Sequence, residues 1–364
     1  MDTVEPALQA FIERIADARR AGASLRIRGG GTKDFYGEAP DGDVLDTRAF
    51  SGTPSYEPTE LVVTTRCGTP LAELEALLAA EGQRLPFEPP HFAPGATVGG
   101  MVAAGLSGPS RANAGSVRDH VLGATLLSGN GDVLSFGGQV IKNVAGYDVS
   151  RLMAGALGTL GLVLEVSLKV LPVARATATL RFEFDQANAL RQLNEWGGLP
   201  LPLDASAWRA GVLSLRLRGA DAAVRSAGLR LGGERVDDGA AEAFWTGLRD
   251  HTGAYFDAAR RAVDAGATLW RLGVAQAAKP LALDGDALIE WHGAQRWLVA
   301  NLPASEVRAV AAAAGGHATL FRGNDRSAGV FTPLSPPLAR IHRELKQSFD
   351  PAGVFNRGRM YPGL

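Results

Sequence analysis

Three consecutive glycines flanked by cations form the first segment whose residue types could do chemistry. The segment reads Arg28-Gly29-Gly30-Gly31-Thr32-Lys33. Consecutive glycines allow successive backbone N–H groups to point at one anionic group, and the threonine hydroxyl and the two cationic side chains would add donors. The pattern predicts a phosphate cradle, with an ordinary glycine turn as the equal alternative. Because it contains neither G-x-x-x-x-G-K-[ST] nor G-x-G-x-x-G, it indicates neither a P-loop kinase nor a nicotinamide dehydrogenase.

A second glycine-rich segment has the small residues that a close backbone approach requires. It comprises Pro94, Gly95, Ala96, Thr97, Val98, Gly99 and Gly100, and it continues through Gly105, Ser107 and Gly108. The Pro-Gly pair predicts a turn, and Thr97 can cap the helix that follows. The small side chains would let this helix lie against a flat or charged group. Tight packing between helices is the alternative explanation.

Three weaker segments complete the set. Exposed donors beside a predicted β-hairpin come from Gly115, Ser116, Arg118 and Asp119. Lys142 and Asn143 stand in the sequence KNVAGYD, and the sequence GALGTLG ends at Gly161 and is followed by Leu162. Each segment is weak evidence alone, but their order and spacing together form a pattern.

Metal and sulfur chemistry has little support in this sequence. The single cysteine, Cys67, cannot form an internal disulfide or supply the thiolates of an iron–sulfur cluster. The six histidines have no ligand spacing; they are His91, His120, His251, His292, His317 and His342. We therefore expect no metal site, and redox chemistry would need an organic cofactor.

Length and composition indicate two folded domains. The chain has 364 residues, 46% of them hydrophobic and 21% charged, which suits compact domains with large cores. Lys plus Arg (37) nearly balance Asp plus Glu (38), so the positive excess that nucleic-acid binding requires is missing. Fifteen of the 45 glycines lie between residues 95 and 161, which indicates a site built from backbone.

The N-terminal sequence MDTVEPALQAFIER is acidic and amphipathic, unlike a targeting segment. No run of about 18 apolar residues occurs, so we expect no transmembrane segment. These features predict a reduced, cytoplasmic protein that would meet a membrane only through a partner.

Residues 1–172 predict a glycine-rich α/β region. Helices are expected over residues 6–19 and 71–82, and strands over 25–28, 61–65 and 162–171. An alternating run over residues 121–136 is interrupted by GNGD, which is a strong hairpin signal.

Residues 173–333 predict a second domain of α+β type, with fewer glycines. Strands are expected over residues 179–184, 212–218, 270–274, 288–300 and 319–322, and helices over 186–196, 220–231 and 305–314. Prolines 333, 336 and 337 indicate a linker. Residues 334–364 then predict a helix over 338–349 and an irregular tail.

Taken together, the motifs resemble those of FAD-binding oxidases and dehydrogenases of the vanillyl-alcohol oxidase/p-cresol methylhydroxylase (PCMH) superfamily. Within it, the chain looks most like the small flavin subunits of bacterial glycolate oxidases. The motifs that carry this resemblance are RGGGTKDFYG, PGATVGGMVAAGLSGPSRANAGSVRDHVLG, KNVAGYDVSRLMAGALGTLG and FDPAGVFNRGRMYPGL.

The resemblance implies an α+β fold in which a PCMH-type FAD-binding domain of two α/β lobes, residues 1–172, is covered by an α+β cap domain, residues 173–333. Residues 334–364 would return to the FAD domain. Residues 28–33 would hold the pyrophosphate, and residues 95–100, Ser107 and Gly108 would line the flavin chain. Arg118 and Asp119 would fix the adjoining segment, Gly161 and Leu162 would meet the adenosine end, and Asn356 and Arg359 would lie near the flavin ring.

Two departures from the superfamily bear on mechanism. The loop RGGGTK has no counterpart of the histidine that carries covalent flavin, which implies noncovalent FAD. Many related 2-hydroxy-acid dehydrogenases have Gly-Ser-Glu-Gly where this chain has Gly155-Ala156-Leu157-Gly158, and they carry a metal-binding histidine cluster in the cap. Metal-assisted substrate oxidation is therefore not indicated here.

Substrate contacts would come mainly from the cap. Arg271, Arg296 and Arg322 each lie on a predicted strand beside an aromatic residue, and a small carboxylate would be bound by such an arginine. Arginines facing solvent or a partner subunit are the alternative. Lys142 and Asn143 would face the flavin ring.

The resemblance implies an FAD-dependent oxidoreductase acting on CH–OH groups. It would be a subunit of a glycolate or other 2-hydroxy-acid dehydrogenase that passes electrons from substrate through flavin to a partner. The implied partners are a larger FAD subunit and an iron–sulfur subunit. Two alternatives stay open: a stand-alone oxidoreductase for another hydroxy acid, sugar or lactone, and a non-catalytic flavin subunit whose sister subunit oxidises the substrate.

Overall fold

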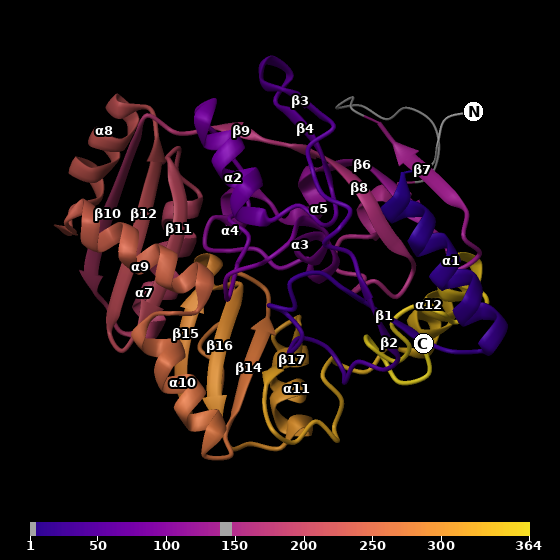
Figure 1. Cartoon of the computed structure of the whole chain (residues 1–364). Helices are drawn as coiled ribbons and strands as arrows, with labels where there is room; N and C mark the ends of the chain where they lie inside the picture. Colours follow the sequence, from indigo (N-terminus) through magenta and orange to yellow (C-terminus); the bar gives the residue numbers. More distant parts are fainter. Residues whose placement is uncertain (1–4, 139–147) are drawn as a thin grey trace.

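The computed structural model describes residues 5–138 and 148–364. Lys142 and Asn143, which we predicted to face the flavin ring, lie outside the described residues. Helices and strands are mixed along the whole chain, so the predicted α+β class is confirmed. In Figure 1, the N-terminal and C-terminal elements lie together at the right, and one large sheet extends across the left and bottom of the molecule.

The N-terminal elements build a small layer against the C-terminal tail. Helix α1 (Pro6–Ala21) ends at Gly22, which adopts the left-handed conformation. Strand β1 (Leu25–Arg28) pairs in parallel with β2 (Asp43–Asp46). On its other side the Leu25 N–H donates to the Val354 carbonyl at 2.7 Å, so the two ends of the chain lie side by side.

A five-stranded antiparallel sheet forms the second layer of the same region. Its strand order is β3 (Ser55–Glu57), β4 (Val62–Arg66), β8 (Leu162–Lys169), β6 (Val121–Leu127) and β7 (Val133–Gly137). The hairpin predicted over residues 121–136 is confirmed as β6 and β7. Short pieces beside this sheet are η1 (Pro58–Glu60) and the paired strands β5 (Gln83–Arg84) and β9 (Leu171–Pro172).

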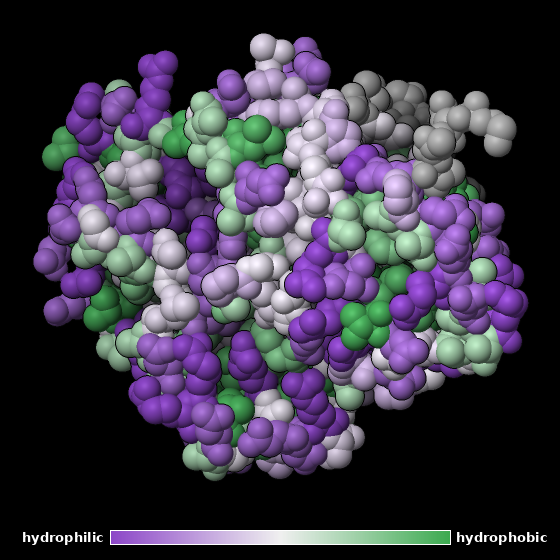
Figure 2. Space-filling model, in the orientation of Figure 1, coloured by the Kyte–Doolittle hydropathy of each residue, from purple (hydrophilic) through white to green (hydrophobic). Residues whose placement is uncertain are grey.

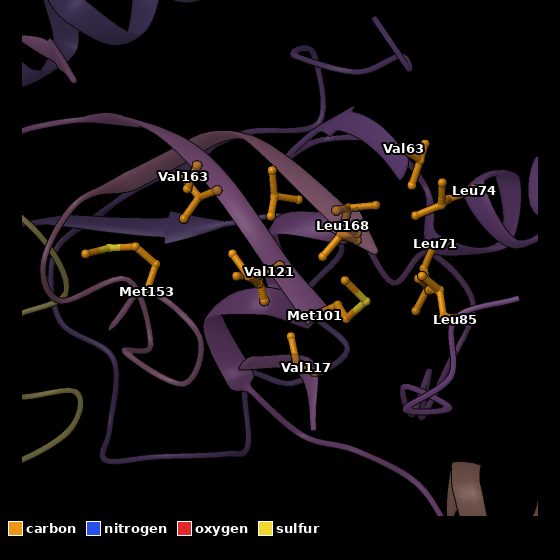
Figure 3. Close-up of a cluster of buried hydrophobic side chains, with 14 of the residues drawn as sticks. Val63, Leu71, Leu74, Leu85, Met101, Val117, Val121, Met153, Val163 and Leu168 are labelled. Atoms are coloured by element: carbon orange, nitrogen blue, oxygen red, sulfur yellow. The ribbon is translucent and has the colours of Figure 1, made fainter. Parts of the chain in front are cut away.

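Helices pack on one face of this sheet and close its core. They are α2 (Leu71–Ala80), α3 (Val98–Ala104), α5 (Val117–His120) and α6 (Val149–Leu152). Figure 3 shows Met101 of α3 and Val117 of α5 facing Val121 and Leu168 of the sheet. Because these side chains are nearly completely buried, the sheet holds α3 and its glycines in one position.

An eight-stranded sheet makes up most of the rest of the chain. Its order is β13 (Glu234–Arg235), β10 (Ala176–Glu183), β12 (Val212–Gly219), β11 (Leu203–Arg209), β15 (Asp286–Glu290), β16 (Gln295–Ala300), β14 (Thr268–Gly273) and β17 (His317–Arg322). Helices α7 (Gln186–Gly197) and α8 (Asp221–Leu231) cover one half of it, and α11 (Ala304–Ala313) covers the other.

Another hydrophobic core joins the large sheet to the N-terminal region. Helices α9 (Asp238–Asp250) and α10 (Ala254–Asp264) supply Trp245 and Phe256, the sheet supplies Trp297 and Phe321, and the N-terminal region supplies Tyr36. Helix α4 (Arg111–Ala114) also lies against β11. The two regions therefore share a hydrophobic core. The domain limits near residues 173 and 333 stay a prediction.

The C-terminal segment begins with helix α12 (Pro336–Phe349), which agrees with the predicted helix. Its Leu345 and Phe349 pack against the core of the five-stranded sheet. Figure 1 shows this helix beside β1 and β2, near the C-terminus.

Two sequence predictions in the second half were wrong or incomplete. Residues 288–300, predicted as one strand, form β15 and β16 joined by the turn η2 (Trp291–Gly293). Positive φ angles at Trp291, His292 and Gly293 reverse the chain there. Helices α9 and α10 were not predicted.

The face in Figure 2 is mostly polar, with hydrophobic residues in small separate patches. No helix within residues 5–138 and 148–364 is long and apolar enough to cross a bilayer.

Candidate functional site

A cavity lies where β1, the glycine loop, α3 and the segment after α6 meet. It has a volume of about 880 Å³, including solvent at its mouth. Many of the predicted cofactor-binding residues line it: Arg28, Gly29, Gly30, Gly31, Thr32, Lys33, Thr97, Gly99, Gly100, Gly161, Leu162, Asn356 and Arg359. The structure thus brings together segments that lie more than 300 positions apart.

The glycine loop presents a row of free donors to this cavity. Within the described residues, no acceptor takes a hydrogen bond from the backbone N–H groups of residues 29–33. Successive free amides of this kind form an anion-binding concavity. The donor set therefore fits the pyrophosphate of a dinucleotide such as FAD.

Neighbouring backbone holds the loop so closely that side chains are excluded from it. A Cβ atom added to Gly30 would lie 1.6 Å from the Gly95 carbonyl oxygen, and one added to Gly29 would lie 2.2 Å from Thr97 Oγ1. Gly31 has a φ of +73°, which favours glycine on its own. The loop therefore requires glycine for packing as well as for ligand approach.

The two cations of the loop have different environments. The Arg28 guanidinium is fixed by an ion pair with Asp34, with 2.7 Å between Nε and Oδ2. Lys33 has no ion-pair partner within the described residues; burial lowers its pKa to about 8, although Asp250 acts in the opposite direction. Its ammonium lies 5.4 Å from the centre of the Phe92 ring. An anion bound in the cavity would stabilise the charged form of Lys33.

The C-terminal tail holds the loop in place from behind. Asn356 Oδ1 accepts a hydrogen bond from the Ile27 N–H at 2.8 Å, and its Nδ2 donates to the Leu157 carbonyl at 2.6 Å. Arg359 donates to the carbonyl oxygens of Asp34, at 2.8 Å, and Glu38. Both residues line the cavity, but their polar groups mainly position the walls.

Small residues of α3 let its backbone approach the opposite wall. Thr97 Oγ1 accepts from the Gly100 N–H at 3.3 Å, so the predicted N-cap is confirmed. A Cβ atom on Gly99 would lie 2.7 Å from Cys67 Cβ. Burial raises the pKa of the Cys67 thiol to about 12. The small residues of α3 therefore both line the cavity and allow close packing, so the two explanations that the sequence offered apply together.

Several predicted cofactor residues lie outside this cavity. Pro94 and Gly95 are exposed, and Ala96 and Val98 are buried in the core of the five-stranded sheet. Gly105 lies against Gly155, where an added Cβ atom would come within 2.7 Å. We therefore assign these five residues a supporting role.

The segment after α4 supports local structure as well. Ser116 and Asp119 form a capping box on α5, and Gly115, with a φ of +89°, precedes them. Arg118 lines a different cavity, between α6 and α12. Ser107 and Gly108 line a small cavity beneath the large sheet.

The three candidate arginines of the large sheet also differ. Arg296 is buried and donates to the carbonyl oxygens of Ala278, Lys279 and Gly293, so we leave it out of the proposed site. The Arg322 guanidinium lies 3.5 Å from the centre of the Phe35 ring, and burial lowers its pKa to about 10. Arg271 lines the small cavity that Ser107 and Gly108 also line.

Several cavity residues were not identified from the sequence. They are Ile27, Asp34, Tyr36, Thr47, Cys67, Ala103, Ala104, Met153, Ala156, Leu157, Gly158 and Val163. The motifs RGGGTKDFYG and GALGTLG contain five of them, which is a signal that could have found these positions. The apolar residues outside the quoted motifs, Ile27, Cys67 and Val163, carry no such signal, because they look like ordinary core. No group of three or more His, Cys, Asp or Glu side chains in the described part of the chain could hold a metal ion.

Comparison with known proteins connects this geometry to one cofactor. Residues 7–137 match the family described as "FAD binding domain". The chain is 45% identical to glycolate oxidase subunit GlcE of Escherichia coli K12 over 356 residues, which cover 98% of each protein. It is 32% identical to glycolate oxidase subunit GlcD of Bacillus subtilis over 168 residues, 45% of this chain and 35% of that protein.

Solved structures support the fold. A structure of alkyldihydroxyacetonephosphate synthase has a TM-score of 0.62 with 15% sequence identity and covers 95% of this chain and 74% of the other. The architecture is thus the one predicted from the motifs, with an FAD-binding fold and a second large sheet.

Proposed function

Because the chain belongs to the GlcE family of glycolate oxidase subunits and is an FAD-linked oxidoreductase by that relationship, we propose that it works as the FAD-binding subunit of a complex that oxidises glycolate or a related 2-hydroxy acid. The full-length identity to the Escherichia coli subunit carries this proposal. The five free amides of residues 29–33 and the cavity behind them support it independently, because they offer a cradle for pyrophosphate.

We propose that FAD is held noncovalently. Residues 28–33 would contact the pyrophosphate, α3 would lie along the flavin chain, and Gly161 and Leu162 would contact the adenosine end. No histidine lines the cavity in the described part of the chain. Cys67 does line it, but a thiol whose pKa is about 12 stays protonated and is a poor nucleophile.

Bound FAD supplies the ability to accept a hydride from a carbon that carries a hydroxyl group. The chain's own residues bind and orient the cofactor and exclude water from it. With a single cysteine, the chain cannot build an iron–sulfur cluster, so electrons must pass from the flavin to an external acceptor. We propose a larger, GlcD-like FAD subunit and an iron–sulfur subunit as these partners, in the cytoplasm, with membrane contact only through them.

Acid precipitation tests the cofactor assignment. The purified chain should be yellow and should release its flavin into the supernatant as free FAD. Colourless protein that takes up no added FAD, or flavin that remains in the pellet, would contradict noncovalent binding.

Co-expression tests the subunit assignment. The isolated chain should turn over glycolate poorly with an artificial dye, and co-expression with both partners should restore dye reduction. Hydrogen exchange should then show a protected surface on this chain, which we expect on the large sheet and its helices. High turnover by the isolated chain, with no gain and no association when the partners are present, would favour a stand-alone enzyme.

A further inference from the structure

The small cavity beneath the large sheet adjoins the proposed FAD cavity. Tyr36 lines the FAD cavity, and its phenol is close enough to Arg271, which lines the small cavity, for the charge of that arginine to act on the Tyr36 pKa. Lys33 lines the FAD cavity and lies against the ring of Phe92, which lines the small one. The linings of the two cavities are therefore in contact through these side chains.

Arg271 is a cation without an anionic partner. It is partly buried, and no carboxylate in the described part of the chain lies within 4 Å of its guanidinium. Its other close neighbour is the Trp291 ring, whose centre is 5.2 Å away. Arg111 lies at 4.5 Å from the same ring and brings a second positive charge close to Arg271, whereas Glu290 is an acidic group whose charge acts on Arg271 without contacting it. Partly buried guanidinium groups are normally paired, which indicates that an anion completes this site.

A buried hydrogen-bond chain fixes the orientation of this guanidinium. Arg271 Nε donates to Gln295 Oε1 at 2.6 Å, and Gln295 Nε2 donates to Glu290 Oε2 at 3.1 Å. The Trp297 indole N–H donates to the same Glu290 oxygen at 2.5 Å. Gln295, Glu290 and Trp297 are each at most 3% exposed. These hydrogen bonds engage Nε of Arg271, so they leave its two terminal nitrogens for a ligand and limit the freedom of the guanidinium. Both features favour carboxylate binding.

His251 is a second polar group in the cavity without a partner. Its side chain is 93% buried, and its Nδ1 makes no hydrogen bond within the described residues. Burial and the charges of Arg322, Arg271 and Arg260 lower its pKa well below the usual value, so the ring is neutral. A neutral imidazole offers one donor and one acceptor. A ligand hydroxyl can donate to, or accept from, the ring nitrogen that faces it.

The walls restrict the size of the occupant. The rings of Phe92, Trp297 and Phe321 line the cavity beside His251, and the space they leave is about 290 Å³ including its open side. A ligand with a carboxylate, one adjacent hydroxyl and few carbons matches these polar groups, and the narrow space between the rings excludes bulkier ligands.

We propose that the small cavity binds a two- or three-carbon 2-hydroxy carboxylate, with Arg271 as its carboxylate anchor, His251 as the partner of its hydroxyl, and Gln295 and Glu290 as positioning residues. This inference rests on the proposed function, since FAD would occupy the adjoining cavity. It means that the chain carries a substrate site of its own and is not only a relay between other subunits.

Calorimetric titration of the FAD-loaded chain tests the proposal. The flavin is reduced chemically beforehand so that no turnover occurs, and the probes are glycolate and ethylene glycol. We expect saturable binding of glycolate and none of ethylene glycol, which lacks the carboxylate. Arg271→Gln should weaken glycolate binding about 10- to 100-fold, as expected for the loss of a charge-assisted hydrogen-bond pair.

Arg111→Gln is the matched control, because Arg111 shares the Trp291 ring but does not line the cavity. Its glycolate affinity should stay within about twofold of wild type. Gln295→Leu is the second test variant. It removes the acceptor for Arg271 Nε but keeps the guanidinium, and glycolate affinity should fall about fivefold.

FAD content, measured for every variant, separates the two proposals. Absence of FAD binding in the wild-type chain would overturn the proposed function. Normal FAD content with no glycolate binding, or with equal binding of ethylene glycol, would overturn only the substrate site. Unchanged affinity in Arg271→Gln would do the same; should that variant fail to fold, unchanged affinity in Gln295→Leu would decide against the proposal.

Discussion

At the scale of single residues, the two cavities are marked by cations that the protein itself does not neutralise. Lys33 beside one cavity and Arg271 beside the other have no ion-pair partner within the described residues. By contrast, Arg28 is paired with Asp34, and Arg296 is surrounded by carbonyl oxygens. Unpaired cations in partly buried positions are costly, and binding of anions at these positions would offset that cost.

Lys33 should make FAD binding dependent on pH. Because burial lowers its pKa to about 8, the free protein loses this charge as pH rises through 8. A bound pyrophosphate favours the charged form, so the dissociation constant of FAD should increase between pH 7 and pH 9. Lys33→Met should weaken binding about tenfold at pH 7 and flatten this dependence. Fluorescence titration of the flavin-free chain measures both effects.

Lys279→Met provides the control for that titration, because Lys279 is exposed and lies outside the cavity lining. It should reproduce the wild-type curve. A Lys33→Met curve that keeps the wild-type pH dependence would exclude Lys33 as its source.

Glu290 should make folding stability depend on pH in the opposite sense from most carboxylates. Burial raises its pKa from 4.5 to about 7, even though Trp297, Gln295 and Arg271 favour ionisation. The folded state therefore binds this proton more tightly than the unfolded state, and its stabilising contribution is lost as pH rises from 4.5 to 7. Glu290→Gln stays neutral, so its free energy of unfolding should improve relative to wild type by up to about 3 kcal/mol between pH 4.5 and pH 8. Urea unfolding at the two pH values measures this; a constant difference would show that Glu290 does not titrate in this range.

At the scale of elements, the glycine loop depends on a second loop that lies far from it in sequence. A valine at residue 30 would meet the Gly95 carbonyl oxygen, because even a Cβ atom lies 1.6 Å from it. A phosphate cradle alone would place that side chain against the phosphate, whereas the structure places it against backbone. A valine at residue 30 would therefore both strain the loop and disrupt the phosphate cradle.

Gly30→Val should consequently lower the FAD content of the purified chain at least tenfold, because the loop must shift away from Gly95 and α3. Gly228→Ala is the control, since Gly228 lies in α8 and an added Cβ atom meets nothing within 4 Å. It should keep full FAD content and gain roughly 0.5–1 kcal/mol in stability. Flavin absorbance per polypeptide measures the first effect, and normal flavin content in Gly30→Val would refute the role of this contact.

Local sequence signals predicted the elements whose own residue pattern specifies them without contacts from distant parts of the chain. Helix α1, strand β1, the β6–β7 hairpin and the Thr97 cap follow from periodicity and turn residues, and each is confirmed. Helix α10 was missed although its apolar face is clear in the structure, because Gly253 and Gly266 frame a short segment rich in alanine and arginine. The turn at Trp291 was missed because no glycine or proline precedes it and positive φ angles at tryptophan and histidine are uncommon.

In the candidate site, too, only the residues with a local sequence pattern were predictable. The residues of the glycine loop were predictable because backbone donors leave a sequence signature. The small cavity also contains residues from a helix end and two strands that only the fold brings together: His251, Gln295 and Glu290. Nothing in their sequence neighbourhood distinguishes them from other buried polar residues, so only the structure reveals their relation to Arg271.

At the scale of the whole molecule, the large sheet is fastened to the FAD-binding region by a buried ion network. Arg216 of β12 pairs with Glu88 of the FAD-binding region at 2.7 Å and with Asp204 of β11. Ser110 Oγ, from the FAD-binding region, donates to Asp204 Oδ1 at 3.0 Å. Burial opposes the ionisation of Glu88, but Arg216 and Arg218 outweigh it and lower its pKa to about 2. The network holds the two regions at a fixed distance and so helps to set the position of the small cavity between them.

Arg216→Met should therefore destabilise the whole chain. The methionine keeps apolar contact with Trp245, whose ring centre lies 4.8 Å from the guanidinium, but it leaves two buried carboxylates with Arg218 as their nearest cation. Removing one partner of a buried pair typically costs about 3 kcal/mol or more. Because the pKa of Glu88 is depressed in the folded state, its contribution is present above about pH 4.5 and is lost as pH falls toward 2. The difference in unfolding free energy should thus be largest at pH 7 and shrink toward pH 3.

Arg191→Met is the control, because it breaks an exposed ion pair with Glu195. It should change the free energy of unfolding by less than about 1 kcal/mol at either pH. Equal effects of the two variants would mean that the buried network does not fasten the regions together.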